Sequence, residues 1–272
     1  MAFAPMSPPP SLSTLLPDVV DVARAAGRAI MAIYRTDFDV HYKDDASPLT
    51  KADLAANRVI AAGLRALTPE LPIVSEEQAH EPFETRRAWP RHWLVDPLDG
   101  TREFVARSGE FSVNIALIEA GKPRLGVVHA PEADVTYAGG AGLGAWRSVG
   151  NGPRTPIGVR RPEGDELVVL TSRTHRDART SAFLAALATR HHLRVERRGS
   201  ALKACLVAAG EAHLYPRLGP TWEWDTAASQ AVLEAAGGVL CEVGGHAPLR
   251  YGKRDLLNPA FYAAYGSDAP HP

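Results

Sequence analysis

The sequence predicts a layered globular protein whose first half is α+β and whose second half is α/β. The first half contains amphipathic helices and an apolar hairpin, whereas strand and helix patterns alternate in the second half. The change from one pattern to the other falls near residue 157. With 272 residues, of which 45% are hydrophobic, the chain can build one large or two modest cores. We therefore expect an α+β half at 12–157 and an α/β half at 158–266, with a ligand cleft between them.

The first half opens with two amphipathic helices. Apolar residues recur at three- and four-residue steps from Leu15 to Ile33, which predicts a helix over 12–35 with Pro17 in its first turn. Helical spacing resumes after Thr50, behind an extended segment at 38–42. Strands are expected at 111–119, 124–129, 135–138 and 145–147, the first two forming a hairpin around the turn at 120–123.

The second half alternates between the two kinds of element. Strands are predicted at 167–170, 193–196, 212–215 and 238–242, and helices at 179–189, 202–209 and 225–236. Such alternation is typical of an α/β arrangement.

Composition and the chain ends exclude several classes. Residues 1–11 are rich in Pro and lack the regions of a signal peptide, which predicts a disordered tail, and 267–272 is expected to fray. No apolar stretch is long enough to span a membrane. A net charge of −1 argues against a nucleic-acid polymer as partner. Cys205 and Cys241 are expected to be buried free thiols in a reducing compartment.

The run from Asp96 to Thr101 is the most informative functional signal. An apolar strand at 93–95 ends at two carboxylates, and Pro97 between them forces the backbone to turn. Gly100 lets the backbone approach a ligand, and a helix beginning near Thr101 would present amide groups to an anion. Taken alone, the run is also typical of a surface turn. The functional interpretation is a site for metal and phosphate.

Two further acidic segments favour the metal interpretation. Glu76 follows a β-branched run, and Asp225 opens an Ala-rich helical pattern. Two carboxylates about 4 Å apart repel by roughly 4 kcal/mol at an effective dielectric constant of about 20. A cluster is therefore tolerated only with cations or raised pKa values. Oxygen ligands without His or Cys suit Mg²⁺ or Mn²⁺ better than Zn²⁺.

These acids and their surroundings resemble the inositol monophosphatase and fructose bisphosphatase superfamily of metal-dependent, lithium-sensitive phosphatases. The resemblance covers about 12–265, and the motifs at 99–104, 109–117 and 199–217 are similar to those of the 3'(2'),5'-bisphosphate nucleotidase branch. It implies an α/β/α/β/α sandwich in which the first half holds the metals and the second half holds the substrate.

The resemblance implies a set of metal ligands. Glu76, Asp96 and the Leu98 carbonyl would hold one Mg²⁺, and Asp96, Asp99 and Asp225 would hold another, so that Asp96 bridges the two ions. Two metals of this kind neutralise charge that develops on a transferring phosphoryl group. Glu76 is also counted among the catalytic residues.

The resemblance also implies groups that bind phosphate and activate water. The amides of Gly100 and Thr101 would bind phosphoryl oxygens, and Thr101 and Asp53 would orient and deprotonate the attacking water. The alternative for Asp53 is a first-turn residue that is favourable to the helix dipole. The substrate would touch three metal ligands as well: Leu98, Asp99 and Asp225.

Residues of the second half would select the substrate. Four match positions that contact the nucleotide in related enzymes: His175, Ser200, Lys203 and Arg217. Lys203 and Arg217 are candidates to bind a second phosphate. As the alternative, each of the four is an ordinary solvated surface group.

Aromatic residues and departures from the family pattern surround Asp225. Trp222 and Trp224 are interpreted as core or cleft wall, with a base-stacking platform as the alternative. Glu223 adds a carboxylate that would disfavour a highly anionic substrate. Ser229 stands where the pattern usually has Gly, and Ala201 where a second Ser is common.

The resemblance therefore predicts a phosphomonoesterase of sulfur metabolism that uses two or three Mg²⁺ ions, with Mn²⁺ as a substitute. Its substrate would be a small phosphorylated nucleotide, adenosine 3',5'-bisphosphate or its sulfated analogue. The alternatives are an inositol monophosphatase, a broad sugar phosphatase, and a non-catalytic regulator that binds nucleotide or metal. A cytoplasmic monomer or homodimer is expected, either free or peripheral on the inner membrane's cytoplasmic face.

Overall fold

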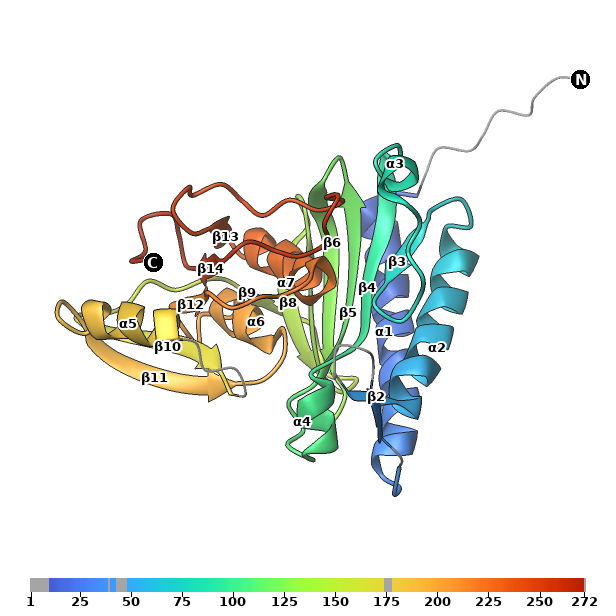
Figure 1. Cartoon of the computed structure of the whole chain (residues 1–272), viewed down its shortest axis with the longest axis horizontal. Helices are drawn as coiled ribbons and strands as arrows, with labels where there is room; N and C mark the ends of the chain where they lie inside the picture. The colour runs from blue at the N-terminus through green and yellow to red at the C-terminus, as the bar shows by residue number, and fades with distance from the viewer. Residues whose placement is uncertain (1–9, 39, 43–47, 174–177, 272) are drawn as a thin grey trace, which may run out of the picture.

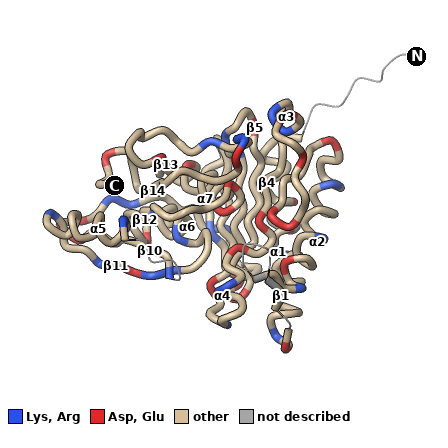
Figure 2. Tube along the Cα trace, in the orientation of Figure 1, with Lys and Arg blue, Asp and Glu red and all other residues tan. Residues whose placement is uncertain are grey.

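The computed structural model describes residues 10–38, 40–42, 48–173 and 178–271, and it folds into five stacked layers (Figure 1). A helical layer, a seven-stranded sheet, a second helical layer, a five-stranded sheet and an outer helix follow one another. The predicted α/β/α/β/α sandwich is thereby confirmed. Lys and Arg positions and Asp and Glu positions are interspersed along the described part of the trace (Figure 2).

Two long helices form the first layer, α1 (Leu12–Tyr34) and α2 (Lys51–Leu67). The Ser11 side chain caps α1 by accepting a hydrogen bond from the Thr14 amide at 3.2 Å. Pro17 is the sixth residue of α1, so the prediction that placed it in the first turn is wrong. The helix accommodates it because the residue four positions earlier, Ser13, is exposed and water can bind its carbonyl.

The large sheet has the order β3-β4-β5-β6-β7-β8-β9, in which only β3 and β4 are parallel. Its strands are β3 (Ile73–Ser75), β4 (Arg91–Asp99), β5 (Ser112–Glu119), β6 (Lys122–Ala130), β7 (Val135–Gly140), β8 (Gly144–Val149) and β9 (Thr155–Ile157). The expected hairpin is β5–β6, and it is confirmed. Two short helices, α3 (Phe83–Arg86) and α4 (Thr101–Val105), flank β4, and a small hairpin, β1 (Val40–Tyr42) and β2 (Pro48–Thr50), precedes α2.

The middle layer consists of α6 (Leu202–Ala208) and α7 (Glu223–Ala235), which pack between the two sheets. The approach of α7 to β6 depends on Gly126, because a Cβ at this position would lie 2.1 Å from the Ala228 carbonyl oxygen. A segment from the second half of the sequence thus packs directly on the sheet of the first half.

The small sheet has the order β11-β10-β12-β14-β13 and is mixed rather than parallel. Its strands are β10 (Glu166–Ser172), β11 (His192–Arg198), β12 (Leu214–Arg217), β13 (Val239–Glu242) and β14 (Phe261–Ala264). β14 is not among the strands predicted from the sequence, and it pairs antiparallel with both β12 and β13. α5 (Ala178–Leu187) packs on the outer face.

Residues 267–271 differ from the expected frayed end. Ala269 is buried, Asp268 forms an ion pair with Arg161, and His271 stacks on Tyr262 with ring centroids 5.0 Å apart. Of the predicted N-terminal tail, residues 1–9 lie outside the described part of the chain. Among the described residues, no helix combines the length and apolar character needed to cross a membrane.

Candidate active site

The acidic loop lies at the end of β4. This strand does not stop at Val95 as predicted but continues to Asp99, because the register against β5 shifts between Asp96 and Asp99. Such an irregularity accommodates Pro97, whose nitrogen cannot donate to a sheet ladder. The loop is held internally, since the Leu98 amide donates to Asp96 Oδ1 at 3.0 Å.

Gly100 links this loop to the predicted helix at Thr101, which is α4. Its φ of 91° lies in the region that favours glycine, and a Cβ here would lie 3.1 Å from the Glu110 carbonyl oxygen. Asp99 is fixed from the other side, because the Ala201 amide donates to its Oδ2. The two halves of the chain therefore meet at Asp99.

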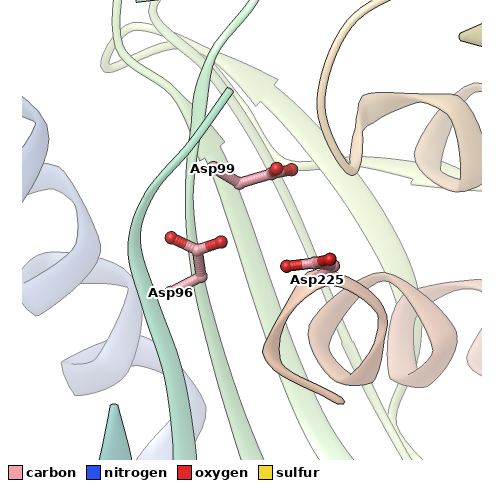
Figure 3. Close-up of side chains that lie close together, drawn as sticks. All are labelled: Asp96, Asp99 and Asp225. Atoms are coloured by element: carbon pink, nitrogen blue, oxygen red, sulfur yellow. The ribbon is translucent and has the colours of Figure 1, made fainter. Parts of the chain in front are cut away.

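Asp225 is brought to the same place by the first turn of α7. Its Oδ2 accepts a hydrogen bond from the Trp222 amide at 2.8 Å, as an acidic residue in the first turn of a helix commonly does. The Asp225 carboxylate extends toward Asp96 and Asp99 of the acidic loop (Figure 3).

Three carboxylates converge at this point: one ligand oxygen each from Asp96, Asp99 and Asp225 lies within 4.8 Å of the others (Figure 3). Burial, followed by the charges of Glu76, Asp99 and Asp225, raises the pKa of Asp96 well above its ordinary value. Burial and the Asp99 charge likewise raise the pKa of Asp225 well above the ordinary value. The ionised cluster is thus strained without a counter-charge.

Glu76 lines the same cavity but is not a member of this close group of three. It follows β3, and its amide donates to the Val95 carbonyl at 3.1 Å, which fixes its backbone beside β4. Its charge contributes to the raised pKa values of Asp96, Asp225 and Asp53.

The donor chemistry fits hard divalent cations. The ligand atoms are carboxylate oxygens, with the Leu98 carbonyl in the same cavity lining. Among the residues that the structure describes, no Lys or Arg forms an ion pair with any of the three aspartates. A bound cation would place positive charge directly between the carboxylates, where no ion pair supplies it.

Thr101 and Asp53 are brought together as predicted. Thr101 Oγ1 donates to Asp53 Oδ1 at 3.3 Å and lies 3.3 Å from the Leu98 carbonyl oxygen. Asp53 Oδ2 accepts from the Thr50 amide at 2.7 Å and from the Thr50 hydroxyl at 2.6 Å, which forms a capping box at the start of α2. Burial raises the pKa of Asp53. The catalytic and the helix-capping interpretations of Asp53 are therefore compatible.

The predicted substrate residues of the second half are partly assembled. Ser200, Lys203 and Arg217 line the cavity of about 270 Å³, whereas His175 lies outside the described residues. Lys203 is buried, its ammonium donates to the Ser200 carbonyl at 2.5 Å, and burial lowers its pKa to about 8. It is not a solvated surface charge. Arg217 donates to the Pro220 carbonyl at 3.0 Å, while its buried Nε has no hydrogen-bond partner among the described residues.

Glu223 does not add charge to the cavity, so the expectation that it would disfavour an anionic substrate is wrong. It is fully buried and accepts hydrogen bonds from the Gly252 amide at 2.7 Å and from the Lys253 ammonium at 2.7 Å. The sequence could not show this, because Lys253 is 30 residues away. Trp222 and Trp224 both line the cavity and stack with an interplanar angle of 13°.

Comparisons with known proteins agree with this geometry. The model of the inositol monophosphatase family matches residues 11–269 of the chain. The chain belongs to the inositol monophosphatase family. This family is metal-dependent, and the acidic cluster at β4 and α7 of this chain is of a type that could hold a metal ion.

Within the inositol monophosphatase family, the chain is similar to curated bisphosphate nucleotidases. It is 49% identical to "3'(2'),5'-bisphosphate nucleotidase CysQ" of Escherichia coli (strain K12), over 91% of this chain and 98% of that protein. The crystal structure of CysQ from Bacteroides thetaiotaomicron matches with a TM-score of 0.83 and 36% identity, covering 93% of this chain and 97% of that one. Inositol monophosphatase from Anabaena matches with a TM-score of 0.72 and 28% identity, covering 94% and 92%.

Two groups that build this inositol monophosphatase-family site were missed in the sequence. Thr50 locks Asp53 through the capping box, and the Thr50-x-x-Asp53 spacing is a signal that could have revealed it. The Ala201 amide that holds Asp99 carries no side-chain signal, because a backbone donor has the same chemistry at every residue.

Proposed function

We propose that this chain is a Mg²⁺-dependent 3'(2'),5'-bisphosphate nucleotidase, which converts adenosine 3',5'-bisphosphate to AMP and phosphate. The observation that carries the proposal is the 49% identity to the nucleotidase CysQ of Escherichia coli over 91% of the chain. The cavity supports it, since an acidic cluster suited to cations lies beside Lys203 and Arg217. We further propose two or three Mg²⁺ ions, Mn²⁺ as a substitute, and the sulfated analogue as a second substrate.

Five groups would hold the cations: Glu76, Asp96, the Leu98 carbonyl, Asp99 and Asp225. Bound divalent cations would neutralise the charge of the phosphoryl group and favour deprotonation of water. The pKa values of Asp96 and Asp225 are raised, so a cation would compete with protons for their carboxylate oxygens.

Thr101 and Asp53 would handle the proton of the attacking water. Thr101 Oγ1 donates to Asp53 Oδ1, which leaves its lone pairs free to accept a hydrogen bond from water. As the water oxygen attacks phosphorus, its proton passes to Thr101 Oγ1 and the threonine proton passes to Asp53. The bond between phosphorus and the 3'-oxygen breaks, and that oxygen takes a proton from a second water. The hydroxide left from this water then takes the proton held by Asp53, which restores the carboxylate. Burial of Asp53 makes its carboxylate a better proton acceptor.

Arg217 is the better candidate for the second phosphate. Its buried Nε has no hydrogen-bond partner in the part of the chain that the structure describes, and a phosphate oxygen would satisfy it. The Lys203 ammonium already donates to the Ser200 carbonyl and lies 5.0 Å from the centroid of the Tyr215 ring. We therefore propose that Lys203 supports the loop at 198–201 and adds positive charge to the cavity.

We place the protein in the cytoplasm. Cys205 and Cys241 are its only cysteines, both are buried, and neither forms a disulfide. Thiols of this kind are typical of a reducing compartment.

Substrate comparison tests the proposed activity. Initial rates of phosphate release are measured with Mg²⁺ on adenosine 3',5'-bisphosphate and on inositol 1-phosphate. We expect kcat/KM to be at least about tenfold higher for the nucleotide, since a site with unpaired polar groups penalises a substrate that lacks the second phosphate. Faster turnover of inositol phosphate would contradict the nucleotidase proposal in favour of inositol monophosphatase activity. Release from neither substrate would favour a binding protein.

A further inference from the structure

The pair of indoles at the start of α7 differs sharply in exposure. Trp224 is 6% exposed, whereas Trp222 is 42% exposed although its ring lies flat against Trp224. The two ring centroids are 5.4 Å apart and the ring planes are inclined by only 13°. One face of Trp222 is therefore covered by its neighbour, and both residues line the cavity of the acidic cluster.

The backbone of Trp222 is tightly fixed. Its carbonyl accepts hydrogen bonds from Asn258 Nδ2 at 2.6 Å and from the Asp225 amide at 3.2 Å. Its amide donates to Asp225 Oδ2 at 2.8 Å, and it forms an isolated antiparallel bridge with Leu257. The position of the indole is thus set relative to Asp225, one of the three clustered carboxylates.

The buried indole supports the exposed one from beneath. Trp224 also contacts His80, with ring centroids 5.2 Å apart and the ring planes tilted by 46°, so two rings pack against it. Trp222 leaves two-fifths of its surface in solvent, and its backbone bonds do not require an indole. The fold itself therefore does not account for a tryptophan at this position.

We propose that Trp222 is a specificity-determining residue whose free indole face stacks on the nucleobase of the substrate. This inference rests on the proposed nucleotidase function and assigns the base to the side of the cavity formed by the start of α7. An aromatic platform binds any base through its π-face. It would thereby distinguish a nucleotide from a phosphomonoester without a base, while discriminating only weakly between adenine and other bases.

The position of Trp222 beside Asp225 is consistent with one extended ligand. The acidic cluster would hold the reacting phosphate, and Arg217 would hold the second phosphate from the small sheet. The indole pair would then cover the base. A stacking contact made equally in the ground state and the transition state strengthens binding without changing the chemical step.

Substitutions at Trp222 test this with two matched substrates. One is adenosine 3',5'-bisphosphate, and the other is the 3,5-bisphosphate of 1,4-anhydroribitol, which keeps the ribose hydroxyl and lacks only the base. We expect Trp222→Ala to raise KM for the nucleotide by about 5- to 100-fold, the effect of losing one base stack, with kcat within about twofold. The kinetic constants for the base-free substrate should not change.

Two further variants separate stacking from apolar bulk. Trp222→Phe keeps a π-face and should retain most of the affinity for the nucleotide, whereas Trp222→Leu should behave like Trp222→Ala. Leu143→Ala is the control, because Leu143 is 39% exposed and lies away from the cavity lining. Thermal melting of each variant reports whether the fold is intact.

The outcomes are distinguishable. If Trp222→Ala affects both substrates equally, or if Trp222→Leu matches Trp222→Phe, the stacking proposal is overturned. If wild-type protein turns over no nucleotide with Mg²⁺, the proposed function itself has failed. Quenching of tryptophan fluorescence by AMP gives a second readout: it should be strong in wild type and much reduced in Trp222→Phe.

Discussion

The Asp53 carboxylate lies between two hydroxyl groups and serves both. Its Oδ2 accepts from Thr50 at 2.6 Å to cap α2, and its Oδ1 accepts from Thr101 at 3.3 Å at the acidic loop. A helix cap is rigid, so the same bonds that stabilise α2 also orient the proposed proton acceptor.

Substitutions can separate these two tasks. Asp53→Asn and Thr101→Ala should each lower kcat by about 100-fold or more, because proton transfer from water is lost. Thr101→Ser keeps the hydroxyl and should keep most of the activity. Thr50→Ala should lower the free energy of unfolding by about 1 kcal/mol, with a smaller loss of kcat. Equal kcat in wild type and Asp53→Asn would leave Asp53 with the capping role alone.

Two buried histidines make the fold sensitive to acid. Burial lowers the pKa of His92 and of His129 to about 4, so both stay neutral in the folded state while the unfolded chain takes up protons below its value of 6.5. Above about pH 6.5 both histidines are neutral in the folded and in the unfolded state. As the pH falls toward 4, the unfolded chain binds protons that the folded protein does not, so the free energy of unfolding falls.

Urea denaturation at pH 7.5 and pH 5 measures this effect. We expect wild type to lose stability on acidification, with each histidine contributing on the order of 3 kcal/mol once the pH reaches 4. His92→Gln removes one titrating group, so its loss between the two pH values should be smaller. An unchanged loss would show that His92 is protonated in the folded state as well.

At the scale of elements, α7 carries Asp225 to the cluster, and its place depends on Gly126 in β6. Gly126→Ala would put a Cβ 2.1 Å from the Ala228 carbonyl, so α7 must move. We expect the free energy of unfolding to fall by more than about 2 kcal/mol, together with weaker divalent-cation binding. Denaturation and calorimetric titration with Mn²⁺ measure the two effects.

Gly142→Ala is the control for a glycine in open space. Unlike Gly126, Gly142 has a positive φ, of 76°, and nothing lies within 4 Å of the added Cβ. Its substitution should cost about 1 kcal/mol of backbone strain and leave cation binding unchanged. If Gly126→Ala were no worse than this control, the close approach of α7 to β6 would not govern the site.

The sequence pattern revealed most elements because apolar periodicity reflects burial. The helices α1 and α2 and the hairpin β5–β6 were foreseen, since each has a continuous apolar face. β14 was missed because Phe261–Ala264 is a short central strand that is buried on both faces and shows no alternation. The passage of β4 beyond Pro97 was missed because it depends on a shifted register with β5.

At the scale of the whole molecule, the site lies where the two sheets meet. Glu110, which precedes β5, accepts hydrogen bonds from Arg173 Nε at 2.7 Å and from the Gly199 amide at 2.8 Å. The loop at 199–201 therefore joins the small sheet to the metal loop. The division at residue 157 stays a proposal, and α7 crosses it by packing on the large sheet.

The acidic residues of the site were recognisable in the sequence, whereas their partners were not. Asp96, Asp99 and Asp225 stand out because each lies where an apolar strand ends or an Ala-rich helix begins, and bringing such carboxylates together is costly without a cation. Glu223 looked equivalent but pairs with Lys253, a contact made only by the folded chain. Sequence thus identifies candidate ligands, and the fold decides which of them face the cavity.

Phosphate release by wild type and by Asp96→Asn, each with Mg²⁺ and with EDTA, tests the central claim most directly. The claim is that a buried carboxylate cluster holds the cations on which phosphate transfer depends. Wild type should release phosphate from adenosine 3',5'-bisphosphate only with Mg²⁺, and Asp96→Asn should lose activity by about 1,000-fold or more while staying folded. Turnover that survives EDTA, or an Asp96→Asn variant of wild-type activity, would contradict the account.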